Sequence, residues 1–126
     1  MREEDSNTKD TLVYWLNCWP PTSNSYYRNV NGRMVMSKKG REFLQYGLTL
    51  IPQREALTGK LYVRVKLYPP DRRKRDIDNH LKALLDLMTK AGVWNDDSQV
   101  DFLSVSREDI VKKGKVSIEI WQLQEN

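Results

Sequence analysis

The chain has 126 residues, of which 39% are hydrophobic and 30% charged, so it holds enough apolar material for one modest core and is not typical of a disordered chain. Lys and Arg outnumber Asp and Glu by 21 to 17, and the basic run Arg72, Arg73, Lys74 and Arg75 favours a polyanionic partner. The single cysteine, Cys18, excludes an internal disulfide and a cysteine-rich zinc site, and we interpret it as a small buried hydrophobic residue.

Residues 1–10 are polar and acid-rich, without the apolar run of a secretory signal, and we expect them to form a flexible extension of a single domain that spans residues 1–126. No later segment approaches the roughly 18 apolar residues of a membrane span. These features predict a soluble, cytoplasmic protein without a membrane partner.

The first predicted element is a strand over residues 11–19, which alternate in polarity and are rich in aromatic and β-branched side chains. Pro20 and Pro21 remove backbone donors and end this strand. A loop over residues 20–32 follows, and residues 33–36 favour a second, short strand.

The middle of the chain predicts one helix and one strand. Ser37 suits the N-cap of a helix that Pro52 ends or kinks, and its core-facing stripe consists of Phe43, Leu44, Leu48 and Ile51. Residues 60–68 form the clearest strand, because Leu61, Val63, Val65 and Leu67 alternate with Tyr62, Arg64, Lys66 and Tyr68.

The C-terminal half predicts a helix and two strands. The helix extends from about Asp78 to Ala91, and Gly92 provides the left-handed residue that ends it. Its predicted buried stripe consists of Ile77, Leu81, Leu84, Leu85 and Met88. After a turn at WNDDS come strands at roughly residues 100–106 and 115–123, joined through a turn around Gly114. The whole pattern predicts an α+β (mixed α/β) fold, with about four to five strands in a mixed sheet and two main helices.

The segment Arg75-Asp76-Ile77-Asp78-Asn79 joins a predicted strand to a predicted helix. Residues two apart point the same way only in an extended segment, so we place the two aspartates at this junction. Close carboxylates repel each other, and a divalent cation removes that repulsion. Mg²⁺ prefers oxygen ligands and supplies the activated water and charge neutralisation that phosphodiester hydrolysis needs. The pair therefore indicates a magnesium-dependent nuclease site.

Three further groups would complete such a site. Lys82 follows Asp78 by four residues, which places its ammonium on the same helix face, within reach of a scissile phosphate. Asp96 and Asp97 lie in the turn after the helix and reach the first pair only if the chain doubles back. The basic run 72–75 would grip phosphates on either side of the cut.

Each group also has a purely structural interpretation. Asp78 suits a helix N-cap, Asp76 favours the helix dipole, and Asp78 with Lys82 forms an ordinary surface pair. Asp96 and Asp97 suit a polar turn, and the basic run suits a solvated loop. Arginines beside paired aspartates nevertheless favour the functional interpretation.

Four aromatic or imidazole side chains have open roles. Tyr26, Tyr27 and Trp94 are candidates for stacking on exposed bases, although aromatic residues more often belong to a core or an interface. His80 has no second histidine at ligand spacing, so we predict an exposed helix residue and no metal role.

The string DRRKRDIDNHLKALLDLMTKAGVWNDDSQV closely resembles the signature of the RusA family of Holliday junction resolvases, small phage and prophage endonucleases. It joins Asp-x-Asp-Asn, a Lys four residues later, a Thr-Lys-Ala-Gly helix end and a Trp-x-Asp-Asp turn in one order. The stretch WPPTSNSYYR at residues 19–28 is similar to the family's N-terminal motif. The resemblance covers the chain from about residue 12 to its end.

The resemblance implies a mixed α/β fold, a homodimer, and dependence on Mg²⁺ or Mn²⁺ without an organic cofactor. It also implies paired nicks across a four-way DNA junction, with a preference for cutting near CC dinucleotides. Carried over by position, the catalytic, metal-binding aspartates are Asp76, Asp78 and Asp97, with Asp96 beside them, and the essential lysine is Lys82. Asn24 and Asn79 match motif asparagines that act in loop structure or phosphate contact, and Arg28 joins the basic run among the expected DNA contacts.

The departures from the family pattern leave the acids and the lysine intact. Thr22 stands where the family often has Ser, His80 replaces a more usual apolar or polar residue, and roughly ten extra residues precede the first strand. These departures leave the fine sequence preference open.

A homodimer also follows from the two-fold symmetry of a junction, because one small domain presents one acidic site. The strand at residues 60–68 and the helix from Ser37 are both candidates for the dimer contact. The competing hypothesis is a non-catalytic module that binds branched or single-stranded nucleic acid through arginine and aromatic side chains. Clustered acids favour catalysis, since without a metal they repel phosphate.

Overall fold

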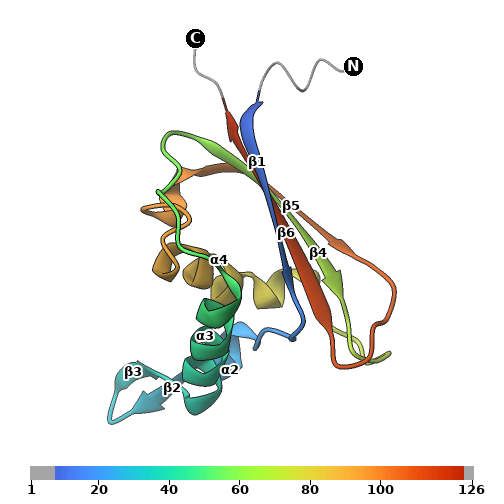
Figure 1. Cartoon of the computed structure of the whole chain (residues 1–126). Helices are drawn as coiled ribbons and strands as arrows, with labels where there is room; N and C mark the ends of the chain where they lie inside the picture. Colours follow the sequence, from blue (N-terminus) through green and yellow to red (C-terminus); the bar gives the residue numbers. More distant parts are fainter. Residues whose placement is uncertain (1–7, 124–126) are drawn as a thin grey trace.

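The computed structural model describes residues 8–123 and consists of a four-stranded sheet with helices on one face and a bare opposite face (Figure 1). The strand order is β1-β6-β4-β5, and β2 and β3 form a separate two-stranded sheet. This arrangement confirms the predicted α+β fold with a mixed sheet. The elements are β1 (Thr8–Leu16), α2 (Ser23–Tyr26), β2 (Tyr27–Val30), β3 (Arg33–Met36), α3 (Lys38–Leu50), β4 (Leu61–Tyr68), the 3₁₀ turn η1 (Ile77–His80), α4 (Leu81–Lys90), the 3₁₀ turn η2 (Asp97–Gln99), β5 (Val100–Arg107) and β6 (Lys115–Leu123).

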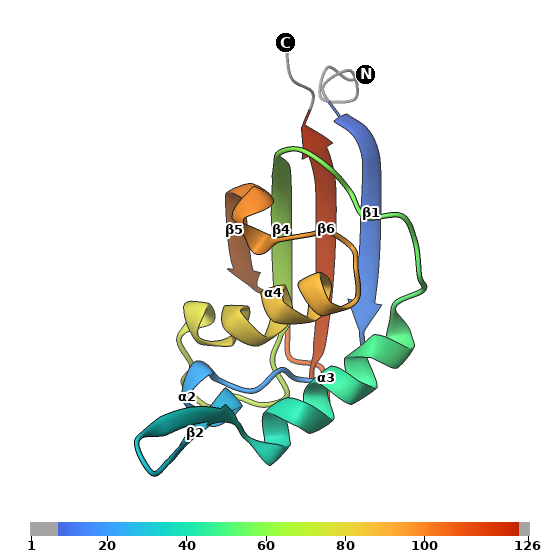
Figure 2. The same ribbon diagram turned by 90° about the vertical axis from the view of Figure 1, so that its left-hand side faces the viewer.

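The core lies between the sheet and the helices (Figure 2). Strand β4 alternates as predicted, with every second side chain from Leu61 to Leu67 almost fully buried. Strand β6 pairs antiparallel with both β1 and β4, and its Val116, Ile118 and Ile120 complete the buried layer. Burial of such aliphatic side chains contributes about 1.5–3 kcal/mol each, so these two central strands dominate the stability of the sheet.

The N-terminal strand begins earlier than predicted, because Thr8–Asp10 already belong to β1, and it ends at Leu16, before the two prolines. The rest of the predicted flexible extension, residues 1–7, lies outside the described residues. Cys18, which follows β1, is only half-buried, but it packs against the core as a small hydrophobic residue would.

The predicted loop at residues 20–32 contains two elements that the sequence pattern did not predict, α2 and β2. Strand β2 pairs antiparallel with the predicted short strand β3. The turn between them has Asn31 at φ 52° and Gly32 at φ 81°, the pair of left-handed residues that a two-residue hairpin turn needs. The hairpin projects from the lower left of the molecule in both Figure 1 and Figure 2.

Helix α3 begins as predicted, since the Ser37 hydroxyl accepts a hydrogen bond from the amide of Gly40 at 3.0 Å. Phe43 and Leu44 are buried, but the prediction for Leu48 is wrong, because it is 41% exposed. The position that faces α4 is Gly47, where an added Cβ would lie 2.6 Å from Leu87 Cδ2. The stripe therefore passes through Gly47, and Leu48 is rotated toward solvent.

The helix predicted from Asp78 begins as the 3₁₀ turn η1 and becomes α-helical only at Leu81. The tighter winding changes which side chains face the core. Ile77, predicted to be buried, is 37% exposed, whereas His80, predicted to be exposed, is 2% exposed. Gly92 ends the helix at φ 79°, as predicted, and the Val93 amide donates to the Met88 carbonyl at 3.0 Å.

The last two predicted strands are confirmed, but they are not neighbours, because β4 lies between β5 and β6. Strand β5 runs parallel to β4, so the connection to β6 must pass the end of β4, where the Val111 amide donates to the Pro69 carbonyl at 2.9 Å. Gly114, at φ 83°, packs in this connection against Trp19, whose Cβ would lie 2.8 Å from an added Cβ. Within residues 8–123, no helix has the length and apolar character needed to cross a membrane.

Candidate active site

A cleft of about 800 Å³ opens where β4 and β5 end. The basic loop, residues 71–75, forms one wall, and Trp19, Asn79, His80 and Arg107 contribute to the others. The cleft therefore joins the N-terminal Trp-Pro-Pro segment to the Asp-x-Asp-Asn segment, which are far apart in the sequence. Both stretches that carry the family resemblance meet here.

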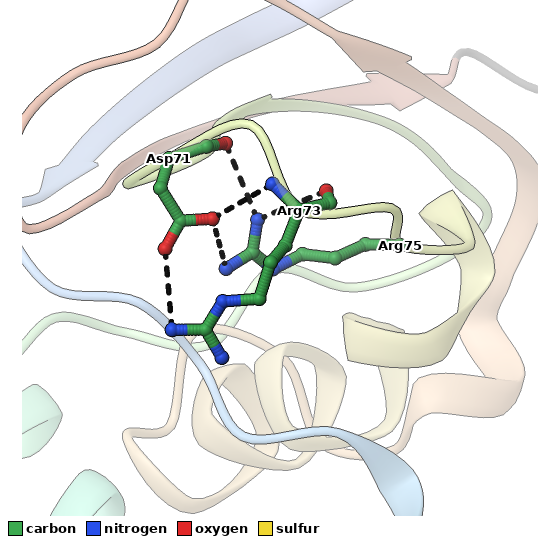
Figure 3. A network of polar contacts seen from close by, with 3 residues as sticks. All are labelled: Asp71, Arg73 and Arg75. Carbon is green, nitrogen blue, oxygen red and sulfur yellow. Dashed lines mark hydrogen bonds and ion pairs between the residues drawn. The ribbon is translucent and has the colours of Figure 1, made fainter.

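Asp71 organises the basic loop (Figure 3). Its carboxylate accepts a hydrogen bond from the Arg73 amide at 3.0 Å and pairs with the Arg75 guanidinium at 2.9 Å, and its second oxygen lies 3.5 Å from Arg73 Nη2. The hydrogen bond from the Arg73 backbone lowers the pKa of Asp71, and the guanidinium of Arg75 adds to that effect. The role of Asp71 depends on the turn of the loop, so the sequence pattern alone does not predict it.

Arg75 is held within the cleft wall. Its guanidinium lies 5.5 Å from the centre of the Trp19 ring and contacts Asp71, and only 18% of its side chain is exposed. The Arg107 guanidinium donates to the Arg75 carbonyl and fixes the backbone at the start of the Asp-x-Asp segment. In this structure Arg75 orders the loop and lines the cleft, and its contact with DNA stays a prediction.

Arg72 and Lys74 are exposed, and neither forms an ion pair or side-chain hydrogen bond with another residue of the range 11–123. Arg73 pairs with Asp71, but 82% of its side chain is exposed. The loop therefore presents three cations to solvent on a backbone that Asp71 and Arg75 hold in place. Such an arrangement can bind several phosphates of a polyanion.

Asp76 and Asp78 directly follow this loop and are both exposed. Asp76 is extended, with ψ 133°, while Asp78 lies in η1, so the pair does not occupy one continuous extended segment as we expected. No described residue forms an ion pair or side-chain hydrogen bond with either carboxylate, although four cations precede them in sequence. The nearby arginines pair with Asp71 instead, and this leaves two free carboxylates, Asp76 in the lining of the cleft and Asp78 two residues beyond it.

Lys82, one turn into the helical segment, is held by Asp86. Lys82 Nζ lies 3.5 Å from one Asp86 oxygen, and the Tyr26 hydroxyl donates to the other at 2.8 Å. Partial burial lowers the pKa of Lys82, but the charge of Asp86 and the adjacent Tyr27 hydroxyl outweigh this effect, so its pKa is raised. Lys82 is therefore a positioned cation at neutral pH, and it does not supply a base.

The acids after α4 have a different environment. The Asp96 carboxylate accepts from the Ser98 amide at 2.9 Å and forms a capping box with Gln99, and this backbone hydrogen bond lowers its pKa. Asp97 is the exposed first residue of η2. Among the side chains of residues 11–123, no three of His, Cys, Asp or Glu are grouped closely enough to hold a metal ion. The structure therefore does not bring Asp97 together with Asp76 and Asp78 in one chain.

Two aromatic candidates for base stacking are wrong for this structure. Trp94 is 1% exposed, and its indole N–H donates to the Thr89 hydroxyl at 2.7 Å. Tyr26 is fully buried, and its hydroxyl donates to the Asp86 carboxylate. Burial, together with Asp86, raises the pKa of Tyr26. Tyr27 is only half-buried and remains at the surface. Two further candidates near Tyr27 in the sequence, Asn24 and Arg28, are both exposed.

His80 is a buried part of the cleft wall. Its ring lies 4.7 Å from the Trp19 ring, and Nδ1 is 2.8 Å from the Pro20 carbonyl oxygen. Burial lowers its pKa, so the ring is neutral at neutral pH. The sequence contains a signal for the burial of His80, because His80, Leu84 and Leu87 have the spacing of one helical stripe. The four-residue spacing of Lys82 and Asp86 is likewise a signal for their contact.

Comparison with known proteins identifies relatives along most of the chain. Residues 18–121 match the family model described as endodeoxyribonuclease RusA. Proteins named crossover junction endodeoxyribonuclease RusA from Escherichia coli K12 and from Shigella sonnei strain Ss046 are 35% identical to it over 108 residues, which is 83% of this chain and 90% of each relative. The protein of that name from Enterobacteria phage 82 has the same identity and coverage.

Proposed function

The chain belongs to the RusA family of endodeoxyribonucleases, and from this premise we propose that it resolves four-way DNA junctions by hydrolysing phosphodiester bonds. The relatives carry the name crossover junction endodeoxyribonuclease, which supports the substrate. The observation that carries the proposal is the pair of exposed carboxylates, Asp76 and Asp78, that lack cation partners among the side chains of residues 11–123 and lie beside a loop of exposed cations. Such acids would repel DNA unless a metal ion neutralised them.

The donor chemistry at the cleft fits Mg²⁺, with Mn²⁺ as an alternative. Mg²⁺ retains several waters and needs only one or two carboxylates, and Asp76 and Asp78 offer two free ones. When bound, the ion supplies an activated water and neutralises charge on the phosphate. We include Asp97 as a third ligand that joins the pair when DNA and protein assemble, while the Asp96 carboxylate already caps η2.

The remaining residues bind and orient the DNA. Lys82, held by Asp86, places a fixed positive charge where the attacked phosphate becomes more negative. Arg72, Arg73 and Lys74 bind phosphates that flank the cut, and Arg28, exposed on β2, is a further DNA contact. Asn24, in α2, and Asn79, in η1, belong to adjoining segments that support the site, since the Asn79 carbonyl accepts from the Ser23 hydroxyl at 3.4 Å.

We further propose that a homodimer makes two paired nicks, near CC dinucleotides, in the two symmetric strands of the junction. A single chain offers one pair of free acids and a junction has two equivalent strands, which supports two active sites per particle. The proposed setting is the cytoplasm, where the DNA substrate and free Mg²⁺ are found, without a membrane or an organic cofactor.

The test is cleavage of a synthetic four-way junction in Mg²⁺ and in EDTA, by the parent protein and by Asp78→Asn, which preserves the shape of the side chain. We expect paired nicks from the parent in Mg²⁺ alone and binding without nicking from the variant. The second candidate function, a non-catalytic module for branched or single-stranded nucleic acid, predicts equal binding by both proteins and no metal-dependent nicking by either.

A further inference from the structure

The β2–β3 arm, residues 27–36, is fixed firmly at its base and free along its length. At the base, Tyr26 is fully buried, and its carbonyl accepts from the Ser37 amide at 3.0 Å. Helix α3 approaches this carbonyl so closely that a Cβ on Gly40 would lie 2.7 Å from it. Beyond the base, the arm extends away from the body of the protein (Figure 1, Figure 2). The fold therefore holds a projecting ribbon in a defined direction.

The base of the arm is connected to the groups proposed for catalysis. Tyr26 donates to Asp86, which holds Lys82, and the Tyr27 hydroxyl lies beside the Lys82 ammonium. On the other side of α2, the Ser23 hydroxyl donates to the Asn79 carbonyl. The arm thus begins beside Lys82, and DNA bound at Lys82 as proposed would also lie next to the arm.

The two faces of the arm differ in chemistry. The register pairs Tyr27 with Met36, Arg28 with Val35, Asn29 with Met34 and Val30 with Arg33, and successive pairs point to opposite faces. One face carries Tyr27, Met36, Asn29 and Met34, and it continues from the Lys82 side. The opposite face carries both arginines together with Val30 and Val35.

The exposure and charge of the arm indicate that it binds something. Met34 is 64% exposed and Val35 37%, while residues 27–36 contain two arginines and no acid. A two-stranded hairpin is at best marginally stable alone in water, so an exposed methionine on it favours a partner. The charge favours a polyanion, since a second copy would bring arginines against arginines.

Resting on the proposed function, we propose that the β2–β3 arm enters the branch point of the DNA junction and separates two of its strands. Its Met34 face packs against bases that are unstacked beside the strand to be cut, as apolar side chains do when they wedge into base steps. Its Arg28 and Arg33 face binds phosphates of the neighbouring strand. The arm then selects branched DNA over linear duplex, because only a branch point offers an opening.

The experiment uses the full chain in EDTA, to prevent cutting, with a junction that carries 2-aminopurine next to the branch point and a linear duplex of the same sequence. This base analogue fluoresces more strongly when it is unstacked. The test variants are Met34→Ala, matched by Leu48→Ala at another exposed apolar site, and Arg28→Ala with Arg33→Ala, matched by Arg54→Ala with Lys90→Ala. Thermal melts check that all variants fold.

We expect Met34→Ala to lose most of the fluorescence rise and to bind the junction on the order of fivefold more weakly, with unchanged affinity for linear duplex. The double arginine variant should lower the slope of log affinity against log salt by about 1.8 for the junction. The matched controls should behave like the parent protein.

Two results would overturn the proposal while leaving the proposed function standing. One is that the parent protein prefers the junction and raises the 2-aminopurine fluorescence, and the arm variants do the same. The other is a change from dimer to monomer in sedimentation of Met34→Ala, which would assign the arm to a second copy of the chain. A parent that shows no preference for the junction over duplex would remove both the arm's role and the proposed function.

Discussion

The two ends of the segment built on α4 each carry a pair of aspartates, and their surroundings give the pairs different roles. Before the helix, Asp76 and Asp78 are exposed beside a loop of cations, and neither pairs with a side chain of residues 11–123. After it, the Asp96 carboxylate is engaged by the Ser98 amide, while Asp97 is exposed. A carboxylate is therefore available as a metal ligand only where local backbone amides do not already bind it.

The largest expected effects on cleavage are at the proposed metal ligands, and they test whether Asp97 acts together with Asp76 and Asp78. We expect Asp76→Asn to slow junction cleavage by on the order of a thousandfold, because loss of a metal ligand removes several kcal/mol of transition-state stabilisation. Asp97→Asn should cause a loss of similar size. Single-turnover cleavage in saturating Mg²⁺ measures both. An Asp97→Asn variant that cuts at the parent's rate would reduce the site to the two acids before α4.

A smaller effect is expected at Asp86, which we assign as a positioning residue for Lys82. Asp86→Asn should slow single-turnover cleavage by about ten- to a hundredfold, the range typical of groups that orient a catalytic side chain, with junction affinity unchanged. In a Lys82→Ala background the same substitution should cause no further loss, since the two residues act as one unit. Additive losses would mean that Asp86 acts through the Tyr26 contact and the helix rather than through Lys82.

The smallest effect is expected at Asp96, and it should appear in stability. Asp96→Ala removes an N-cap and should lower the free energy of unfolding by about 1 kcal/mol, whereas Asp96→Asn, which also caps, should have almost no effect. Urea unfolding measures both. Neither variant should change the cleavage rate, and a strong loss of cleavage in Asp96→Asn would place this carboxylate among the metal ligands.

The sequence predicted the elements whose signals are local. The alternation at β4, the Ser37 cap and the left-handed Gly92 each depend on a few neighbouring residues, and all three are present. What it could not predict are features set by packing. Leu48 is exposed because Gly47 approaches α4, and β5 does not pair with β6 because β4 occupies the place between them.

The site shows the same division. The string from Asp71 to Val100, through its resemblance to a family, indicated the segment of the chain that forms much of the cleft. The chemical roles of the acids and of Lys82 remain predictions. The roles of Asp71, Arg75 and His80 depend on how the loop folds over Trp19, so residue type alone was misleading. Arg75, expected as a DNA contact, also holds the loop in place, and the DNA contact stays a prediction, while His80, expected to be exposed, is buried.

The side chain of Trp19 packs against Gly114, and its ring lies 5.5 Å from the Arg75 guanidinium. A side chain at position 114 would therefore displace Trp19, which lines the cleft, and would disturb a loop about forty positions earlier in the chain. The turn between the last two strands, which contacts no DNA in our proposal, therefore places a steric constraint on the evolution of the DNA-binding cleft. A natural substitution at Gly114 should be interpreted first as a change in substrate binding, and only then as a change in a surface loop.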